Sequence, residues 1–469
     1  MNKKIFGVLI IASFLYNDIV CSQDYFGYSN FGGITSAIYN PANIAASRYK
    51  FNLNLISTNF YVGSNMYELN SKKFFNFDFS NLQEGTDYNK INDGGAKRFS
   101  ANVDFVGPSL LFNLNKKTSI GITTRVRTLM NFDNLSNSSF NLLTTGNTDF
   151  YNQNFTESNV SYNIHSFADL GVTFAKEIYK TNTHQLKVGV TLKYVKGIGG
   201  GSVYINHLDV LNLKNADTIS KIYGNFNVGY SRNIEDIVNG NMSSGLSQLG
   251  SSSGNSGIAT DIGVVYQYRN HKKYPYKWRI GLSITDICVS AINYSNGTQG
   301  GNYIINKNNF TNIATSVTTQ QNGETFDQYL HRLEDQSLIS VTHNDSAAPF
   351  NMNLPTALHL NMDLHLIKSL YLNTYLLINL AGTNQLYTNY YTSTYIASPR
   401  FDKKWFSLLM PFSYNSLNEF NWGLGLRFGP LFLGSGSLFS NLTKDKVHNT
   451  DLKLSLAIPF YRSYKSTQQ

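Results

Sequence analysis

The feature that most constrains this chain is an alternation of apolar and polar side chains that recurs along most of its length. It is plainest near the C-terminus, where every second residue from Phe420 to Phe428 is apolar, and again from Leu452 to Phe460. Successive side chains of a β-strand point to opposite faces, so each of these segments has one apolar and one polar face. A strand of a soluble sandwich can show the same pattern.

Repetition of this pattern favours a barrel in a membrane. Segments of about ten residues follow one another with aromatic residues at many of their ends and no helical crossover, as in a transmembrane barrel that is apolar outside and polar inside. We expect about 14 strands, near residues 48–61, 99–114, 118–132, 164–180, 186–194, 258–269, 277–291, 354–367, 369–381, 385–397, 403–412, 419–428 and 431–440, with a closing strand that ends at Phe460.

Short and long connections alternate between these strands. With both termini in the periplasm, the short ones all fall on the periplasmic side, as in outer-membrane barrels, and they are residues 115–117, 181–184, 270–276, 368, 399–402 and 429–430. The long connection at residues 197–257 is expected to carry an extra hairpin near residues 222–230. The predicted fold class is therefore all-β, a transmembrane antiparallel β-barrel of about 14 strands in the bacterial outer membrane.

Composition argues against an ordinary soluble domain and against a helical membrane protein. Only 14% of the residues are charged, against about a quarter in ordinary soluble domains, yet the mean hydropathy is −0.24. Beyond the N-terminus, no apolar run reaches the roughly 18 residues that a transmembrane helix requires. The net charge of +9 is spread along the chain, and no nucleic-acid-binding motif is present, so nucleic acid is not an expected partner.

The N-terminus reads as a secretory signal peptide over residues 1–22. Lys3 and Lys4 precede an apolar run over residues 5–15, and cleavage is expected before Gln23. A lipoprotein acylated at Cys21 is the alternative, but the bulky Val20 disfavours it. Cleavage would leave Cys288 as the one cysteine, so no intramolecular disulfide is expected.

The strand predicted over residues 354–367 places His359, Asp363 and His365 on its polar face. Imidazole and carboxylate could share a metal ion or a proton, but alternate residues on a strand lie about 6.5 to 7 Å apart and do not converge. Polar lining of the lumen is the simpler interpretation because barrel interiors are polar. We therefore expect no metal site.

Further charges are expected to face the lumen. We single out Arg125, Arg127, Lys187, Arg279 and Arg427 among a set that also includes Asp169, Lys193, Asp261, Arg269, Asp451 and Lys453. Opposite signs favour ion pairs that stiffen or close the lumen, and a selectivity filter for anions is the alternative. No catalytic residue or cofactor is expected, because the chain has no Gly-x-Ser-x-Gly elbow and the glycines at residues 197–201 lack the rest of a phosphate-binding loop.

Residues 40–46 read Asn-Pro-Ala-Asn-Ile-Ala-Ala, and Asn40 with Pro41 is a favourable start for a short helical turn. With the preceding Gly32-Gly33-Ile34, and with residues 283–287 and 399–407, this stretch resembles a group of Bacteroidota outer-membrane barrels related to FadL-like fatty-acid transporters and PorV-like secretion-associated barrels. The resemblance covers essentially all of the mature chain and points to an uncharacterised family of such barrels.

The resemblance implies a short N-terminal plug over residues 23–47 that contains Asn40, Pro41 and Ala42, followed by a barrel over residues 48–469 with long extracellular loops. It implies passive transport of a small hydrophobic or amphipathic compound. An enzyme is not expected, because nothing in the sequence spaces a nucleophile with a histidine and a carboxylate. The alternative function is a non-transporting scaffold for a secretion or surface-assembly partner. Outer-membrane lipid, a hydrophobic small molecule and a surface protein are thus the candidate partners.

Overall fold

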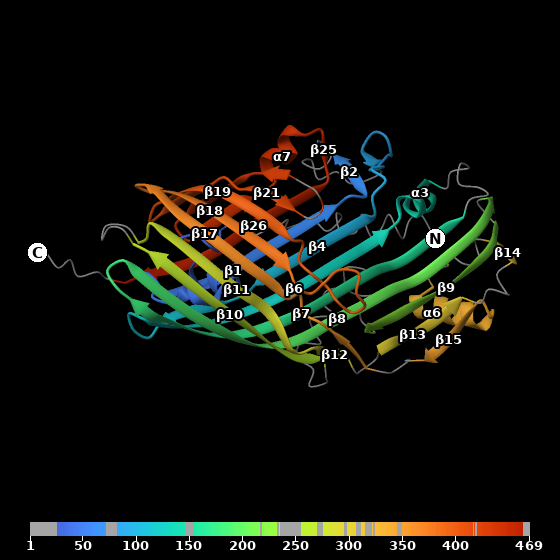
Figure 1. Ribbon diagram of the computed structural model, residues 1–469, viewed down its shortest axis with the longest axis horizontal. Coiled ribbons are helices and arrows are strands. Elements are labelled where there is room, and N and C mark those ends of the chain that lie inside the picture. The colour runs from blue at the N-terminus through green and yellow to red at the C-terminus, as the bar shows by residue number, and fades with distance from the viewer. Residues whose placement is uncertain are drawn as a thin grey trace, which may run out of the picture.

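The computed structural model shows a closed antiparallel β-barrel (Figure 1). It describes residues 26–462 except 72–81, 146–153, 216–217, 232–233, 235–254, 270–274, 295–297, 306–310, 315–320, 322–323, 345–348, 416 and 418–419. The expected signal peptide therefore lies outside the described residues. No helix in this part of the chain is both long and apolar enough to span a membrane.

Fourteen staves, each a single strand or two successive strands in line, form the described barrel wall. This number confirms the predicted count and the all-β fold class. The first and last staves, β1 and β26, pair from Tyr49 with Tyr461 to Gly63 with Asn449 and so close the barrel. In order, the staves are β1 (Tyr49–Ser64), β4 (Lys97–Val106) with β5 (Ser109–Asn113), β6 (Thr118–Leu135), β7 (Phe155–Lys180), β8 (His184–Asn215), β10 (Ser256–Tyr268), β11 (Trp278–Ser290), β17 (Ala357–Ile367), β18 (Leu370–Asn379), β19 (Thr394–Asp402), β20 (Phe406–Leu409) with β21 (Phe412–Asn415), β22 (Phe420–Trp422) with β23 (Leu424–Phe428), β24 (Leu431–Ser435) and β26 (Asn449–Tyr461).

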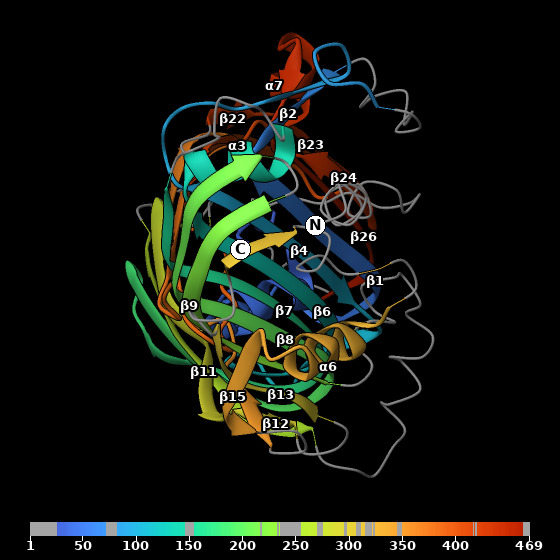
Figure 2. The same ribbon diagram turned by 90° about the vertical axis from the view of Figure 1, so that its right-hand side faces the viewer.

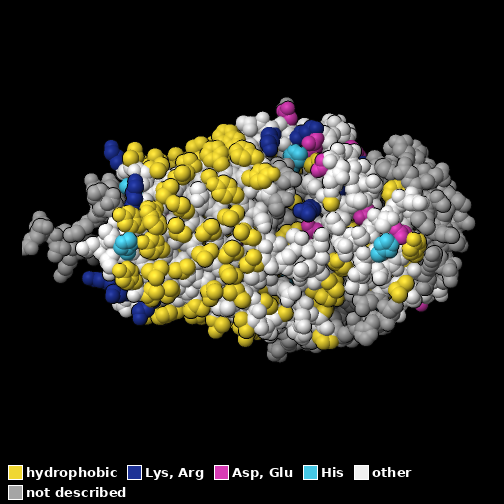
Figure 3. All heavy atoms as spheres, in the orientation of Figure 1, with side chains coloured by type: hydrophobic (Ala, Val, Ile, Leu, Met, Phe, Trp, Pro, Cys, Tyr) yellow, Lys and Arg dark blue, Asp and Glu magenta, His cyan; other side chains and the backbone are white. Residues whose placement is uncertain are grey.

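The period-two alternation sets the two faces of the wall. On β8, Val190 and Leu192 are 44% and 60% exposed, whereas Thr191 and Lys193 between them are buried in the interior. On the face shown in Figure 3, apolar side chains of this outward kind gather into a belt over the end of the barrel that carries the short turns. Exposed aromatic residues beside these turns include Tyr179, Trp405, Phe428 and Phe460.

Beyond the belt, β7 and β8 continue well past the predicted strand ends. The expected loop from residue 197 is instead strand up to Asn215, and β9 (Thr218–Ser231) pairs with it. The glycines there are needed because a Cβ at Gly200 would lie 2.2 Å from the Met352 sulfur, inside the barrel. The predicted hairpin near residues 222–230 is thus one strand of a longer β8–β9 hairpin.

Further elements surround the mouth at this end. On one side, β13 (Thr298–Ile305), β14 (Thr311–Ala314) and β15 (Ile339–Asn344) extend the sheet from β9, and α6 (Phe326–Asp335) packs on them through Leu330 and Leu333. On the other side (Figure 2) lie α3 (Asn137–Thr145), α7 (Leu438–Thr443) and a small sheet of β2 (Tyr67–Asn70), β3 (Tyr88–Lys90) and β25 (Lys446–Val447).

Three segments fold into the lumen. From the short-turn end comes the N-terminal lumen segment, residues 26–46, with two short 3-10 helices, η1 (Gly33–Ile38) and η2 (Pro41–Ile44). From the other end come the β12–β16 pair (Ile292–Tyr294 with Phe350–Met352) and the inward loop, residues 381–393.

The inward loop corrects two predictions. The strand expected at residues 385–397 is β19, which begins only at Thr394, and the turn expected at residues 399–402 belongs to that strand. The actual turn comprises residues 403–405. Threonine and tyrosine in the loop sequence favour strands, and their contacts inside the barrel override that local preference.

Candidate functional site in the barrel lumen

The N-terminal lumen segment sits on glycines of the barrel wall. A Cβ at Gly189 of β8 would lie 2.4 Å from the carbonyl carbon of Pro41, and one at Gly263 of β10 would lie 2.2 Å from the side-chain oxygen of Asn40. At Gly121 of β6, a Cβ would lie 2.8 Å from Ile34. Only glycine lets backbone approach this closely, so the wall has a seat shaped for the segment.

Hydrogen bonds hold the segment in this seat. The Asn40 side chain accepts a bond from the backbone N–H of Ala42 at 2.9 Å and so caps η2, which confirms the predicted helical turn. Its amide also donates to the carbonyls of Val264 and Leu282 on β10 and β11, at 3.2 and 3.3 Å. Asn40 therefore joins the segment to the wall, and Pro41 and Ala42 are buried behind it.

The inward loop closes the lumen from the opposite end. Asn389, which is fully buried, donates to the carbonyls of Leu129 and Asn163 at 3.3 and 3.0 Å and to the side-chain oxygen of Asn131 at 2.9 Å. Next to it, the Tyr390 hydroxyl donates to Asp133. The loop is thus tied to β6 and β7 from inside the barrel.

An apolar cluster fills the rest of this half. Tyr294 and Met352 of the β12–β16 pair pack on Phe167 and Val195, which face inward from β7 and β8. The Phe350 ring stacks between those of Tyr294 and Tyr387, with ring centres 5.2 and 5.0 Å away. The lumen is therefore packed with side chains on the long-loop side of the barrel.

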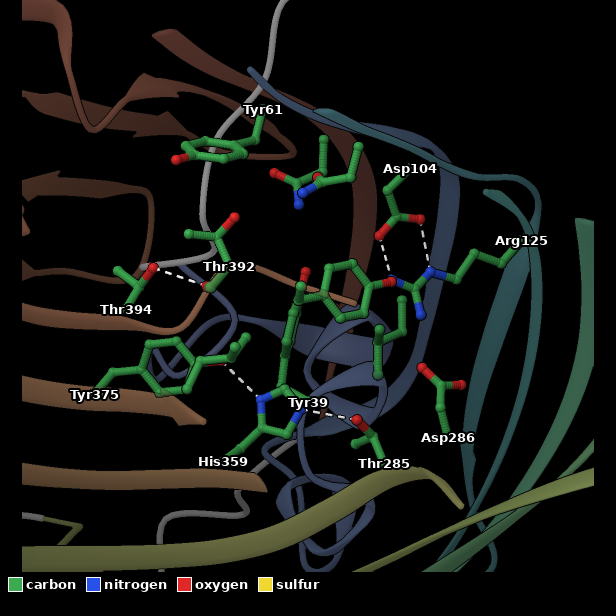
Figure 4. A pocket seen from close by; sticks show the side chains of 15 residues that line it. Tyr39, Tyr61, Asp104, Arg125, Thr285, Asp286, His359, Tyr375, Thr392 and Thr394 are labelled. Carbon is green, nitrogen blue, oxygen red and sulfur yellow. Dashed lines mark hydrogen bonds and ion pairs between the residues drawn. The ribbon is translucent and has the colours of Figure 1, made fainter. Parts of the chain in front are cut away.

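A cavity of about 60 Å³ lies between the N-terminal lumen segment and the inward loop (Figure 4). Tyr39 comes from the segment and Tyr391 from the loop, while the wall contributes Tyr61, Tyr375 and Leu377. Ligand pockets typically enclose about 300 to 1,000 Å³. The closed cavity has room for a few water molecules only, and a larger guest requires one of the two segments to move.

Ion pairs line one side of the cavity and continue behind it. Arg125 pairs with Asp104 through two hydrogen bonds, one of them 2.6 Å long. Arg127, 1% exposed, contacts Asp169 at 2.8 Å and Asp286 at 2.6 Å. Lys193 extends the network, with its ammonium 2.8 Å from both Asp261 and Asp286.

Asp286 reaches this network because of a β-bulge. Thr260 of β10 pairs with Ile287 and Ile262 pairs with Ile284, so Thr285 and Asp286 together oppose the single residue Asp261. Asp286 has φ +56°, and its backbone N–H donates to the Asp261 carboxylate at 2.7 Å. Bulges redirect side chains and end strand pairing, and both effects are seen here.

The wall is interrupted beyond this bulge. Pairing between β11 and β17 ends at Thr285 with Ala357, whereas β11 stays paired with β10 up to Ser290. Across the interruption, the Thr356 hydroxyl donates a 2.7 Å hydrogen bond to the Asp286 carbonyl. The site thus combines a lumen cavity, a charged network and a break in wall pairing.

The three residues predicted on the polar face of β17 are buried, but each has its own partners. His359 is joined to Thr285 at 2.8 Å and to Tyr375 at 2.7 Å (Figure 4), and Asp363 binds Arg279 and Arg400 at 3.1 and 2.8 Å. His365 is 2.9 Å from the Lys368 carbonyl. Among the described residues, no group of three or more His, Cys, Asp or Glu residues could hold a metal ion.

The remaining predicted cations lie near the short turns. Arg279 donates to the carbonyl of Tyr28 in the N-terminal lumen segment. Arg427 binds the carbonyls of Lys403, Lys404 and Gly429 and stacks on Phe31, 4.2 Å from its ring centre. Lys187 is buried as well. The structure therefore places all eight singled-out lumen residues inside the barrel and divides them between two regions.

Sequence reasoning missed Asp286, the residue that joins the charged network to the break in wall pairing. Asp286 follows Trp278, Ile280, Leu282 and Ile284 on the predicted outward face of its strand. A carboxylate in that series is the signal of a bulge, because an aspartate is disfavoured on an apolar face. Asp104, which lies within a predicted strand, was also not singled out. The same holds for Arg400, which lies in the turn wrongly predicted at residues 399–402.

Residues 41–436 match DUF5723, described as a family of unknown function. No curated protein sequence matches the chain.

Similar solved structures include a variant of the TodX monoaromatic hydrocarbon channel, at 10% identity over 91% of this chain and 94% of that one, with a TM-score of 0.42. The Ralstonia pickettii toluene transporter TbuX is 11% identical over 92% and 94%, with a TM-score of 0.40. A Pseudomonas aeruginosa FadL homologue is 11% identical over 94% and 100%, with a TM-score of 0.31. Identities this low carry no substrate over to the present chain.

Proposed function

Because the chain belongs to DUF5723, a family of unknown function, we propose its function from the barrel itself: passive passage of a small hydrophobic or amphipathic compound across a bacterial outer membrane. The proposal rests on three features of the described residues. They are the apolar belt, the cavity between two non-covalently held segments, and the interrupted wall beside that cavity.

The belt supports the outer-membrane location. Every backbone polar group in lipid must be paired within the protein, and a closed barrel satisfies this requirement. An apolar band about 25 Å tall with aromatic residues at its edges is typical of outer-membrane barrels. The belt in Figure 3, with exposed Trp405 and Phe428 beside the short turns, has this character.

The break between β11 and β17 is the observation that carries the transport proposal. Pairing ends at Thr285, which itself lines the cavity. A compound that enters the cavity could leave sideways through this break without crossing the N-terminal lumen segment. Transport requires the inward loop or the lumen segment to move, since the closed cavity is too small for a substrate.

A second function, a non-transporting scaffold for a secretion or surface-assembly partner, is favoured by a different observation. The packed interior around Tyr294, Met352 and Asn389 leaves no wide path in the described part of the chain. A scaffold needs no path, and the extension built from β9, β13, β15 and α6 offers a surface to a partner.

The test uses Cys288, a half-buried thiol two residues beyond Asp286 on the interrupted side of β11. Protein lacking residues 1–22 would be reconstituted in liposomes, and uptake of a radiolabelled long-chain fatty acid would be measured before and after alkylation with a bulky maleimide. Transport through the break predicts saturable uptake that alkylation blocks in the native sequence but not in Cys288→Ser. If uptake is absent, the transport proposal is wrong and the scaffold is preferred.

A further inference from the structure

Lys187 is a buried cation without a counter-ion in the described structure. It lies on β8, four residues beyond Thr183 at the end of the short turn, and is 7% exposed. Every other lysine predicted in the lumen, such as Lys193, has a carboxylate or ring partner. Within the described residues, the ammonium of Lys187 has no hydrogen bond or ion pair, so no direct partner holds its positive charge.

Two arginines on neighbouring strands add to this charge. Arg269 follows β10 and donates to the side chain of Gln185, and Arg279 of β11 donates to Tyr28 and Asp363. In both guanidinium groups the Nε–H is buried and has no partner in the described part of the chain. Lys187 pairs with Val265 of β10, which on its other side pairs with Gly281 of β11, two residues from Arg279. Three cationic side chains therefore lie at one end of the lumen, and each has a hydrogen-bond donor without a partner among the described residues.

The nearest carboxylate does not neutralise them. Glu177 of β7 faces Lys187 in the strand register, but its side chain accepts a hydrogen bond from Gln185 and lies 3.5 Å from the ammonium of Lys180. Asp363 is shared between Arg279 and Arg400. Both carboxylates are already engaged, and among the described residues the region keeps an excess of positive charge.

An uncompensated buried charge is costly, because transfer of an ion out of water is repaid only by a partner of opposite charge with well-formed hydrogen bonds. An oxyanion supplies several acceptor oxygens at once and forms the stronger, charge-assisted class of hydrogen bond. We propose that Lys187, together with Arg269 and Arg279, binds one oxyanion, a carboxylate or a phosphate, at the short-turn end of the lumen.

The site lies on the wall next to the N-terminal lumen segment. Gly189, two residues after Lys187 on the same face of β8, contacts Pro41 of that segment, and Arg279 holds the carbonyl of Tyr28. The site is separate from the cavity between the segment and the inward loop, whose lining includes none of the three cations. It therefore does not depend on the transport proposal.

The test is anion binding by the full barrel in detergent, measured by isothermal titration and by the midpoint of thermal unfolding. Inorganic phosphate, acetate and decanoate would be compared with chloride at equal ionic strength. Phosphate or acetate should raise the unfolding midpoint above that in chloride. If phosphate binds more strongly than the two carboxylates, the ligand is of the free phosphate type. If decanoate binds more strongly than acetate, the ligand is the carboxylate of an amphiphile.

Matched variants separate this site from general charge effects. Lys187→Gln should weaken binding about tenfold or more, which is the loss of one charge-assisted hydrogen bond. Lys176→Gln, which changes an exposed lysine on the neighbouring strand β7, should bind as the native sequence does. Arg269→Gln provides a second removal if Lys187→Gln does not fold. Equal binding in the native sequence and in either removal variant, or no anion response in the native sequence, would overturn the proposal.

Discussion

Arg127 and Asp286 lie 159 residues apart in the chain, and their side chains form two hydrogen bonds in the lumen, of 2.6 and 2.9 Å. One residue stands on β6 and the other on the bulge of β11, so the pair spans the barrel interior. Arg127 also binds Asp169, and Asp286 also binds Lys193. The interruption of the wall is thus coupled to a network that reaches β6, β7 and β8.

Asp286→Asn tests this coupling. The change leaves Arg127 and Lys193 buried with less negative charge, and breaking a buried pair typically costs about 3 to 5 kcal/mol. We expect a loss of that size in the free energy of unfolding, measured by urea titration in detergent. Asp327→Asn removes the half-exposed partner of His331 on α6 and should cost less than about 1 kcal/mol. Equal losses would show that the buried network stabilises the barrel no more than an exposed ion pair does.

Val190→Arg tests the apolar belt. Val190 is 44% exposed on the outer face of β8, and an arginine on the lipid face costs about 2 to 4 kcal/mol at the membrane midplane. Leu442→Arg changes a side chain that is 56% exposed on α7, outside the belt. This control should stay within about 0.5 kcal/mol of the native protein. Unfolding in lipid vesicles measures both, and similar costs would place the membrane elsewhere.

Gly189→Val tests whether the N-terminal lumen segment blocks the barrel. Its Cβ would fall 2.4 Å from the carbonyl carbon of Pro41, so the segment must leave its seat. If the segment acts as a plug, single-channel conductance in planar bilayers should rise, as it should on deletion of residues 26–46. Gly95→Val is the control, because there a Cβ meets Asp93 at no less than 3.5 Å. A folded Gly189→Val protein with native conductance would exclude the plug.

Asn389→Ala tests the opposite closure. The substitution removes three hydrogen bonds to Leu129, Asn131 and Asn163, each worth about 0.5 to 1.5 kcal/mol. We expect the inward loop to detach more often, seen as faster amide hydrogen exchange in residues 381–393 and as more frequent channel openings. Asn65→Ala, which removes an exposed amide bound to the Ala96 carbonyl, should change neither. A loop protected as in the native protein would contradict this role.

The small sheet at the mouth should weaken in acid. Partial burial acts to raise the pKa of Glu68, but hydrogen bonds from Lys446 and Asn89 and the nearby positive charges outweigh it and lower that pKa. A lowered folded-state pKa gives stability that is present above the unfolded value, about 4.3 for glutamate, and lost as the pH falls through the folded value. Hydrogen exchange of β2 and β25 should therefore accelerate below about pH 4. Glu68→Gln should remove this pH dependence.

Some features of the candidate site were open to prediction from sequence. The inward placement of Arg127, His359 and Arg427 follows from alternation along single strands, which depends on neighbouring residues alone. The helical turn capped by Asn40 is local for the same reason. Asp286 was not open to this reasoning, because one extra residue in a bulge reverses the face that every later side chain takes.

The sequence by itself determined the class of fold, the number of staves and the two faces of the wall, since all three arise from a short-range period of two and from turn chemistry. Tertiary structure decided how the lumen is filled. Residues 381–393 carry strand-forming side chains, yet Asn389 and Tyr390 find buried partners on β6 and β7 more than 200 positions earlier. Such partners exist only after the barrel closes, because burial and hydrogen bonding inside the lumen then outweigh local preference.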